Sequence, residues 1–342
     1  MLVDMHAHVI PDELAPVSKT SRAPKPPHVE PAVDDSTARV LVSEHMRFRA
    51  SRIWFSAEER LQAMERHGVD AEVISPIPAL LDYTLAPADG RELSRRVNDF
   101  VLQLCASSAT RFFGFGLVPL QDPDLAAKEL PDLVQSGLRG IEVSSNINGI
   151  SIGDQQFWEF FSEVERLGLA VFVHALNPTM ADRMPMAVAG TYALAVEQTV
   201  AVTSVATGGL AERCPHLRLA FSHGGGGFAA LIPRAHFFWA RTWNEEPPAE
   251  RPVGDDGLSL PSPFEQARRY YYDGLTFDHR ALRLAIDMLG ASRILVGTDF
   301  PAIEREEPVG RTLRSMGLPD AVVEQITWTN CFEFLGVRPP VI

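Results

Sequence analysis

Apolar, strand-like runs alternate with amphipathic, helix-like stretches along almost the whole of this 342-residue chain. Many of the runs are nearly continuous in apolar residues, which is typical of parallel strands buried on both faces. Eight such runs are present, at residues 2–8, 71–77, 112–120, 138–144, 170–174, 217–223, 270–275 and 294–299. Helix-like segments lie at residues 57–68, 90–106, 124–137, 154–168, 197–213, 279–289 and 320–335. The alternation predicts a fold built from β-α units.

The number of runs and the glycines between them make the fold prediction specific. Gly68, Gly137, Gly168 and Gly290 each end a helical stretch shortly before the next strand, as helix C-caps do. Eight strands, most of them followed by a helix, are the count of a (β/α)8 TIM barrel, and chains of this length commonly form one such domain. We therefore predict an α/β fold in which residues 1–342 form a single barrel.

Three long connections interrupt the pattern. Residues 11–55, after the first strand, are rich in proline and charge, and we predict that they fold as a small lobe on the barrel. Residues 177–192 follow the fifth strand, and residues 243–263 precede the seventh. Loops of this length are usually either functional or disordered, and in a barrel they could overhang the mouth of the active site.

Histidine or aspartate lies at the end of four of the strand-like runs. His6 and His8 end the first run, His174 the fifth, His223 the sixth and Asp299 the last. Successive strand residues point to opposite faces, so His6 and His8 share a face and can bind one ion. Imidazoles with a carboxylate, and no thiolate nearby, are ligands for zinc or a similar divalent metal with an open catalytic position. Barrel enzymes build their sites at the carboxyl ends of strands, so the pattern predicts a metalloenzyme.

Charge and cysteine content narrow the partners and the compartment. A formal net charge of −13 argues against a polyanionic partner such as nucleic acid. Cys105, Cys214 and Cys331 are widely spaced, without a CxxC, as expected of reduced thiols. We find no signal peptide, and no apolar run of the roughly 18 residues that a membrane-spanning helix needs. We therefore expect a cytoplasmic protein that acts on a small molecule and has no membrane partner.

Several motifs resemble those of the amidohydrolase superfamily, and within it the branch of aminocarboxymuconate-semialdehyde decarboxylase and its relatives. The resemblance covers nearly the whole chain, including residues 113–120 and 330–335, and the combination HxH, H, HGGG and GTDFP is specific for this branch. The motifs in this chain are Asp4-Met5-His6-Ala7-His8, Phe172-Val173-His174, Ser222-His223-Gly224-Gly225-Gly226 and Gly297-Thr298-Asp299-Phe300-Pro301. This combination of motifs is specific for the branch, but it is much weaker evidence for any one substrate.

This resemblance implies a single divalent metal ion, most often zinc (Zn²⁺) and sometimes manganese (Mn²⁺). The residues that it assigns as metal ligands are His6, His8, His174 and Asp299. It also implies that His223 lies beside the metal and acts as an acid/base rather than as a ligand. Many other amidohydrolases hold two metals bridged by a carboxylated lysine on strand four, but residues 138–145 contain no lysine, which favours a mononuclear site. Glu142 on this strand could in principle reach a second ion, but a buried structural role is favoured.

Two arginines match positions that contact the substrate in the family. Arg49, in the pair Phe48-Arg49, resembles an arginine that faces the substrate carboxylate. Arg234 matches the position from which decarboxylases of this branch place an arginine in the neighbouring subunit's site, which implies a homodimer. Arginine suits this task because its planar fork binds a carboxylate bidentately and stays charged. Arginines in polar loops are usually solvated, so the alternative of a plain surface residue stays open for both.

The resemblance breaks after His174. Semialdehyde decarboxylases commonly continue with Pro-Trp, whereas this chain has Ala175-Leu176, and residues 177–191 lack the family's tryptophan-containing segment. We expect a remodelled pocket wall, with room beside the small Ala175 for a larger or differently shaped aromatic acid.

The leading hypothesis is a metal-dependent, non-oxidative decarboxylase of an unsaturated or aromatic (hydroxy)carboxylic acid, acting in aromatic-compound catabolism. Asp299 or His223 would protonate the reacting carbon, and the metal would orient the substrate as a Lewis acid. Arg49 and Arg234 would hold the substrate carboxylate. The first alternative is hydrolysis or hydration of a lactone, amide, C–C or alkene bond by the same metal site. The second is a barrel that only binds ligands, and the intact set of metal-ligand residues argues against it.

Overall fold

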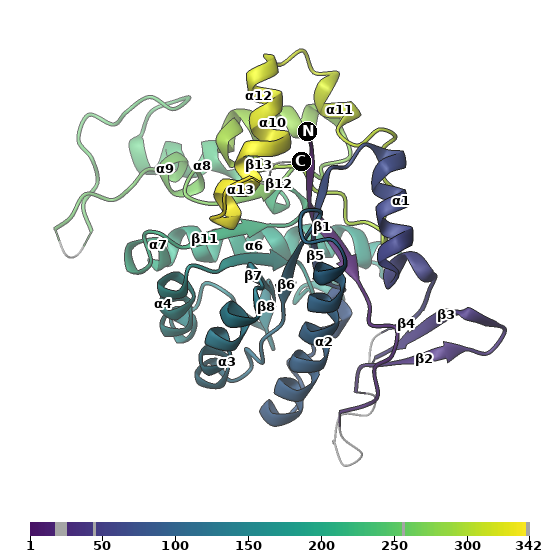
Figure 1. Ribbon diagram of the computed structural model, residues 1–342. Helices are drawn as coiled ribbons and strands as arrows, with labels where there is room; N and C mark the ends of the chain where they lie inside the picture. Colours follow the sequence, from purple (N-terminus) through teal and green to yellow (C-terminus); the bar gives the residue numbers. More distant parts are fainter. Residues whose placement is uncertain (18–25, 44–45, 255–256, 340–342) are drawn as a thin grey trace.

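The computed structural model describes residues 1–17, 26–43, 46–254 and 257–339, and its centre is a parallel β-barrel surrounded by helices (Figure 1). The predicted TIM-barrel fold is confirmed. Eight strands follow one another around the sheet in sequence order, and each pair of neighbours is parallel. They are β1 (Val3–Val9), β5 (Ala71–Pro76), β6 (Phe112–Gly116), β7 (Gly140–Ser144), β10 (Ala170–His174), β11 (Arg218–Phe221), β12 (Tyr271–Asp273) and β13 (Ile294–Leu295).

The barrel closes between β1 and the segment that follows β13. Ala7 and Phe300 form a parallel bridge, and the backbone N–H of His8 donates to the carbonyl of Phe300 at 2.6 Å. The N–H of Asp299 donates to the carbonyl of His6 at 2.7 Å. Closure therefore holds the segment that carries Asp299 directly against the strand that carries both N-terminal histidines.

The helices pack around the outside of the sheet. They are α1 (Ala57–His67), α2 (Pro87–Ser107), α3 (Pro123–Ser136), α4 (Trp158–Leu167), α5 (Met186–Val188), α6 (Leu194–Thr207), α7 (Leu210–Arg213), α8 (Phe228–Ala240), α9 (Pro263–Ala267), α10 (His279–Leu289), α11 (Arg311–Arg314), α12 (Asp320–Glu324) and α13 (Asn330–Leu335). Gly68, Gly137 and Gly168 are left-handed C-caps of α1, α3 and α4, as predicted. Gly290 after α10 has a positive φ of 93° but an extended ψ of 135°, so this helix ends in a different turn.

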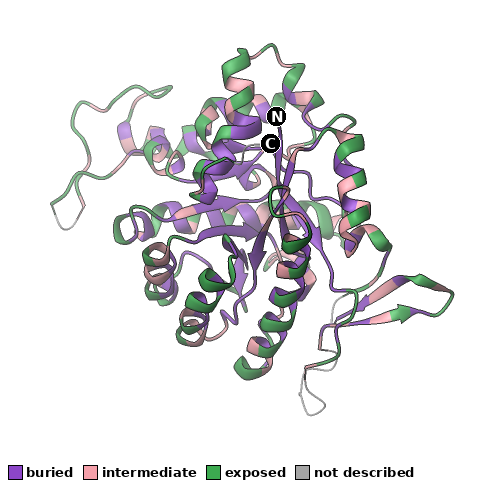
Figure 2. Cartoon of the chain, in the orientation of Figure 1, coloured by how far each residue is buried: buried purple, intermediate pink, exposed green. Residues whose placement is uncertain are grey.

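Two apolar layers stabilise the barrel, one inside the sheet and one between the sheet and the helices (Figure 2). Inside, Phe115 and Phe172 pack with Phe334 of α13, whose ring lies 6.0 Å from that of Phe115. Burying a side chain of this size stabilises the fold by about 1.5–3 kcal/mol. The same inner cluster includes Val3 and Ala71, the first residues of their strands, so α13 covers the amino ends of the strands. The carboxyl ends are left for a functional site.

The described part of residues 11–55 contains a small antiparallel sheet, and that these residues fold as a lobe of their own stays a prediction. The strands of this sheet are β2 (His28–Ala32), β3 (Asp35–Val42) and β4 (Arg47–Ala50), which lie to one side of the barrel below α1 in Figure 1. Phe48 packs edge-on against Trp54 with ring centroids 4.9 Å apart, and this contact joins the lobe to the outer apolar layer. Residues 18–25 and 44–45 of the lobe lie outside the described part. That residues 1–342 act as one domain stays a prediction.

The other two long connections differ in shape. Residues 177–192 contain short helical turns, including α5, and buried Glu197 of α6 anchors their start by accepting hydrogen bonds from the backbone N–H (2.9 Å) and hydroxyl (3.0 Å) of Thr179. A small hairpin of β8 (Asn146–Ile147) and β9 (Ile150–Ser151) lies after β7. The described residues 243–254 and 257–262 run away from the barrel between α8 and α9 (Figure 1). Among the described residues, none of the helices has the length and apolar character needed to cross a membrane.

Candidate metal centre

Four residues converge at the carboxyl end of the barrel. They are His6 and His8 near the end of β1, His174 as the last residue of β10, and Asp299 in the segment after β13. One potential ligand atom from each lies within 4.8 Å of the others, and all four residues are buried. The structure therefore brings together the four residues that the resemblance assigns as metal ligands.

The two histidines of β1 aim the same ring nitrogen at one point. His6 Nε2 lies 3.0 Å from His8 Nε2, and His8 Nε2 lies 3.0 Å from Asp299 Oδ1. The other nitrogen of His6 is fixed, because its Nδ1–H donates to Oδ2 of Asp273 at 2.6 Å. Two ring nitrogens at this distance repel each other through their lone pairs unless a proton or a metal ion lies between them. The arrangement fits a metal ion bound by imidazole nitrogen.

His174 is oriented in the same way by a backbone group. Its Nδ1–H donates to the carbonyl of Ala175 at 2.9 Å, while its Nε2 is buried with no hydrogen-bond partner in the described part of the chain. Burial, together with the nearby rings of His6 and His223, lowers the pKa of His174 well below its usual value. The neutral imidazole that results is the form that binds a metal.

Asp299 divides its carboxylate between two sets of neighbours. Oδ1 faces the Nε2 atoms of His8 at 3.0 Å and His6 at 3.5 Å, while Oδ2 lies 3.4 Å from Nε2 of His223. Burial raises its pKa, but the positive character of His6, His223 and His8 outweighs burial and holds the pKa well below the usual range. Asp299 is therefore an ionised carboxylate, suited both to bind a cation and to pair with a protonated His223.

His223 is the most accessible member of the group. Its side chain is 21% exposed, against 12% for Asp299 and almost none for His6 and His8. Burial opposes its protonation, but the hydrogen bond to Asp299 and the charges of Asp273 and Asp299 together raise its pKa. An imidazole that is open to an incoming molecule and paired with a carboxylate can hold and deliver a proton.

The glycines after His223 serve the packing of this turn. Gly226, with φ of 65°, approaches the first turn of α6, where an added Cβ would lie 2.1 Å from the carbonyl oxygen of Ala195. A Cβ on Gly224 would meet Thr276 at 2.8 Å. The run is required by neighbouring elements that hold the His223 turn.

A buried network of charges lies beside the cluster and was not predicted. Asp4 and Glu72 both accept hydrogen bonds from Nη2 of Arg305, at 2.5 and 2.6 Å, and Glu72 also pairs with Arg60 at 2.7 Å. Arg60 donates a further hydrogen bond to the carbonyl of His8 at 2.9 Å. Two carboxylates thus balance two guanidinium groups, and the network fixes the backbone of a cluster residue.

The local shape of β1 explains why Asp4 belongs to this network. In a regular strand Asp4 would share the face of His6 and His8. The register of β1 against β5 shifts between Asp4 and Ala7, and Met5 packs in the inner apolar cluster. The carboxylate of Asp4 instead accepts from the hydroxyl and backbone N–H of Thr298, next to Asp299. Asp4 therefore supports the segment of one cluster residue rather than orienting a histidine ring.

Asp273 was also missed, although a signal for it was present. It ends β12 after three tyrosines, so it repeats the pattern of an apolar strand closed by an ionisable residue. Glu142 on β7 is fully buried but is not part of the four-residue cluster. Burial raises the pKa of Glu142 to about 7, although the charge of His8 opposes this.

The structure does not place the two predicted arginines with the cluster. Arg49 on β4 is about half exposed and pairs with Asp34 at 2.5 Å and Asp35 at 3.1 Å, at the turn between β2 and β3. Arg234 is exposed on α8, and its guanidinium lies over the ring of Phe238, 5.1 Å from the centroid. Their contact with a substrate stays a prediction. Ala175, the small residue expected to widen the pocket, is buried and donates its N–H to Ser222 Oγ at 3.3 Å.

Comparison with known proteins places this geometry in context. A model of the amidohydrolase family matches residues 3–337. The 2-amino-3-carboxymuconate-6-semialdehyde decarboxylase of Dictyostelium discoideum is 31% identical over 84% of this chain and 79% of that protein. The gamma-resorcylate decarboxylase of Polaromonas sp. is 28% identical over 82% of this chain and 87% of that protein. A solved structure of a dihydroxybenzoic acid decarboxylase from Polaromonas sp., with bound manganese and the inhibitor 2-nitroresorcinol, has a TM-score of 0.69 at 25% identity and covers 83% of this chain and 87% of that one.

Proposed function

Because this chain belongs to the amidohydrolase family, and relatives within that family are named as decarboxylases, we propose that it is a metal-dependent, non-oxidative decarboxylase. Its substrate is an aromatic or unsaturated (hydroxy)carboxylic acid, the class that the names of the relatives describe. The observation that carries the proposal is the convergence of three imidazoles and one carboxylate, with His223 beside them and open to an incoming molecule.

We propose that His6, His8, His174 and Asp299 hold one divalent ion. The unpartnered Nε2 of His174 and the facing Nε2 atoms of His6 and His8 support this assignment. Nitrogen-rich ligand sets favour zinc among the common divalent ions, and the related structure with bound manganese makes manganese the alternative. When bound, the ion supplies Lewis-acid polarisation of a substrate oxygen.

The protein's own contribution is a proton placed at carbon. Loss of CO2 directly from an sp² carbon would leave an unstable carbanion, so protonation of that carbon must come first. His223 donates this proton from Nε2, and the nearby carboxylate of Asp299 stabilises the imidazolium beforehand. The bond to the carboxylate then breaks, its electron pair restores the unsaturated system, and His223 regains a proton from solvent. Asp299 and His223 thus act together as the catalytic pair.

We further propose that the active species is a homodimer in which Arg234 reaches the neighbouring subunit's site. Arg234 lies on α8, the helix that follows His223, and its surroundings include the exposed aromatic residues Phe238 and Trp243. Exposed aromatic and arginine side chains of this kind are typical of interfaces between subunits. Arg49 would bind the substrate carboxylate from within the same chain by exchanging its two aspartate partners for it.

A cytoplasmic location completes the proposal. All three cysteines are free, and Cys214 and Cys331 are buried. Free thiols are typical of proteins that stay in a reducing compartment.

The test is elemental analysis of purified protein, paired with CO2 release from a panel of hydroxybenzoates and carboxymuconate-type acids. We expect about one metal ion per chain, and CO2 in equal amount to a product that has one carboxylate fewer than the substrate. Bound metal with no CO2, but with solvent oxygen incorporated into a product, would move the assignment to a hydrolase or hydratase. Protein that retains neither metal nor any activity would show that the cluster is not a metal site.

A further inference from the structure

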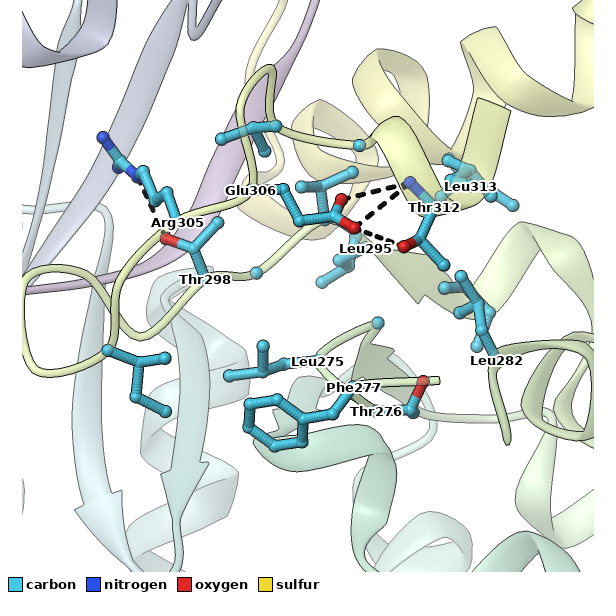
Figure 3. A pocket seen from close by; sticks show the side chains of 18 of the residues that line it. Leu275, Thr276, Phe277, Leu282, Leu295, Thr298, Arg305, Glu306, Thr312 and Leu313 are labelled. Atoms are coloured by element: carbon cyan, nitrogen blue, oxygen red, sulfur yellow. Dashed lines mark hydrogen bonds between the residues drawn. The ribbon is translucent and has the colours of Figure 1, made fainter. Parts of the chain in front are cut away.

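A second cavity lies outside the barrel wall and shares no lining residue with the four-residue cluster. It has a volume of about 220 Å³ and is enclosed by the loops after β12 and β13 and by helices α10 and α11 (Figure 3). In Figure 3, Leu275 and Phe277 lie on one side of it, and Glu306, Thr312 and Leu313 lie on the opposite side. Its apolar lining includes Leu275, Leu282, Val296, Leu313 and Ile326.

The cavity and the metal cluster lie on opposite sides of the segment after β13. Val296 packs in the outer apolar layer and lines the cavity. Gly297, the next residue, borders both sites: it lines the cavity, and a Cβ on it would lie 2.7 Å from Cβ of Asp273 and 2.9 Å from Cβ of His6. A molecule in the cavity is therefore separated from the metal ligands by the chain itself, although it contacts the segment that leads to Asp299.

Size and lining fit a molecule with one aromatic ring. An apolar protein cavity of about 150 Å³ lined by similar aliphatic side chains admits benzene. The present cavity is larger at about 220 Å³, and its lining residue Phe277, which is 73% exposed, marks where it meets solvent. A ring can enter there without the sheet opening.

The charges of the lining select against a carboxylate. Asp278, Glu304 and Glu306 all contribute to it. Asp278 pairs with Arg280 at 3.0 Å, and Glu306 accepts hydrogen bonds from Thr312, including its backbone N–H at 3.2 Å. The guanidinium of Arg305 points away from the cavity (Figure 3), where its Nη2 pairs with Asp4 and Glu72. Its Nη1 has no hydrogen-bond partner among the described residues, but the two carboxylates already balance its charge. A carboxylate oxygen of Glu306 beside aliphatic side chains is instead an acceptor for a hydroxyl group.

We propose that this cavity is a binding site for a neutral, single-ring phenol, separate from the metal centre. The assignment rests on the cavity and not on the reaction. Loss of CO2 from a hydroxybenzoate also yields a neutral phenol. This link between the cavity and the reaction rests on the proposed function. The site would then hold the product class of the enzyme while excluding its carboxylate substrates.

The experiment is a titration of 4-fluorophenol and of 4-fluorobenzoate with metal-loaded protein, followed by fluorine NMR. Leu282→Phe fills the cavity from α10, and Leu284→Phe, on the exposed side of the same helix, is its matched control. Leu275→Trp fills the half-buried mouth and keeps the test valid if the first variant fails to fold.

We expect 4-fluorophenol to bind wild type and Leu284→Phe equally, and to bind Leu282→Phe and Leu275→Trp about tenfold more weakly. Binding of 4-fluorobenzoate should not depend on these variants. Equal phenol binding by all four proteins, no phenol binding by wild type, or an equal dependence for 4-fluorobenzoate would each overturn the proposal. None of these outcomes depends on CO2 release, so the proposed function can fail or hold separately.

Discussion

The metal cluster and the two predicted arginines are built in opposite ways. Each cluster residue is buried, and rings such as those of His6 and His174 are held by a second hydrogen bond to Asp273 or to a backbone carbonyl. Arg49 and Arg234, in contrast, are exposed side chains on β4 and α8 whose partners are surface residues. The chain fixes the position of the cluster by its own fold, whereas the arginines need a substrate or a second subunit to fix theirs.

This difference separates two kinds of functional residue. Substitution of a residue that the fold preorganises should lower the metal content of the protein. Substitution of a residue that a substrate or a second subunit positions should leave the metal content unchanged and weaken substrate binding. The predictions below test this division, and they run from the largest expected effect to the smallest.

The largest effect is expected for His174→Ala. The change removes an imidazole whose Nε2 is buried without another partner in the described residues. Metal content should fall to background, and kcat/KM should drop by about a thousandfold or more, since a bound metal supplies several kcal/mol of transition-state stabilisation. Elemental analysis and CO2 release measure the two effects. His216→Ala, which changes an exposed histidine, should alter neither. Full metal occupancy in His174→Ala would remove this residue from the ligand set.

A smaller effect on the metal is expected for Asp273→Asn. The carboxylate of Asp273 accepts the Nδ1–H of His6 and so directs the other ring nitrogen into the cluster. Loss of its charge should weaken metal affinity about 10–100-fold, the usual cost of removing a partner behind a metal ligand. Titration against a chelator measures this affinity. Asp278→Asn, in the same loop but paired with exposed Arg280, is the control and should bind metal normally. Unchanged affinity in Asp273→Asn would mean that the barrel holds His6 without help.

Most of the cluster could be predicted from the sequence because its positions follow from the strands. Apolar runs locate β1 and β10, and their last residues must lie at the carboxyl end of a parallel barrel. The run at residues 294–299 was expected to be strand throughout, but β13 ends at Leu295. Asp299 has a positive φ of 57°, so the chain has left the extended conformation by then.

The supporting residues could not be predicted in the same way. Arg305 meets Asp4 and Glu72 across separations of 301 and 233 residues, and nothing local to any of the three marks that contact. The register shift in β1, which turns Asp4 toward them, also has no signature in the short run of residues around it. Asp273 is the exception, since it closes an apolar strand as His174 of the cluster does.

For the partner-dependent residues, Arg234→Ala should sharpen the contrast. We expect normal metal content, and KM raised about 10–100-fold because a charge-assisted contact to a carboxylate contributes about 1.5–3 kcal/mol. Dilution of the wild type into monomers should reproduce the loss, and analytical ultracentrifugation at the assay concentration shows which species is present. Arg241→Asn removes the other guanidinium beside Phe238 and should have little effect. Full activity in a confirmed monomer would refute a role in the neighbouring site.

The smallest effect is expected for Arg49→Ala. The two aspartates that hold Arg49 are exposed, and exposed ion pairs contribute little to stability, so they can be exchanged for a substrate carboxylate at little cost. Because Arg49 must give up its aspartate partners, its net contribution to substrate binding is small. We expect KM to rise by about tenfold or less, with kcat and metal content unchanged. Arg47→Ala is the matched control, because Arg47 lies on the same strand and pairs with Glu30 at 2.9 Å. If both variants have the same KM as the wild type, Arg49 is a surface residue of the lobe, and the substrate carboxylate must find its positive charge elsewhere. If Arg49→Ala alone raises KM, the lobe takes part in binding although none of its described side chains belongs to the metal cluster.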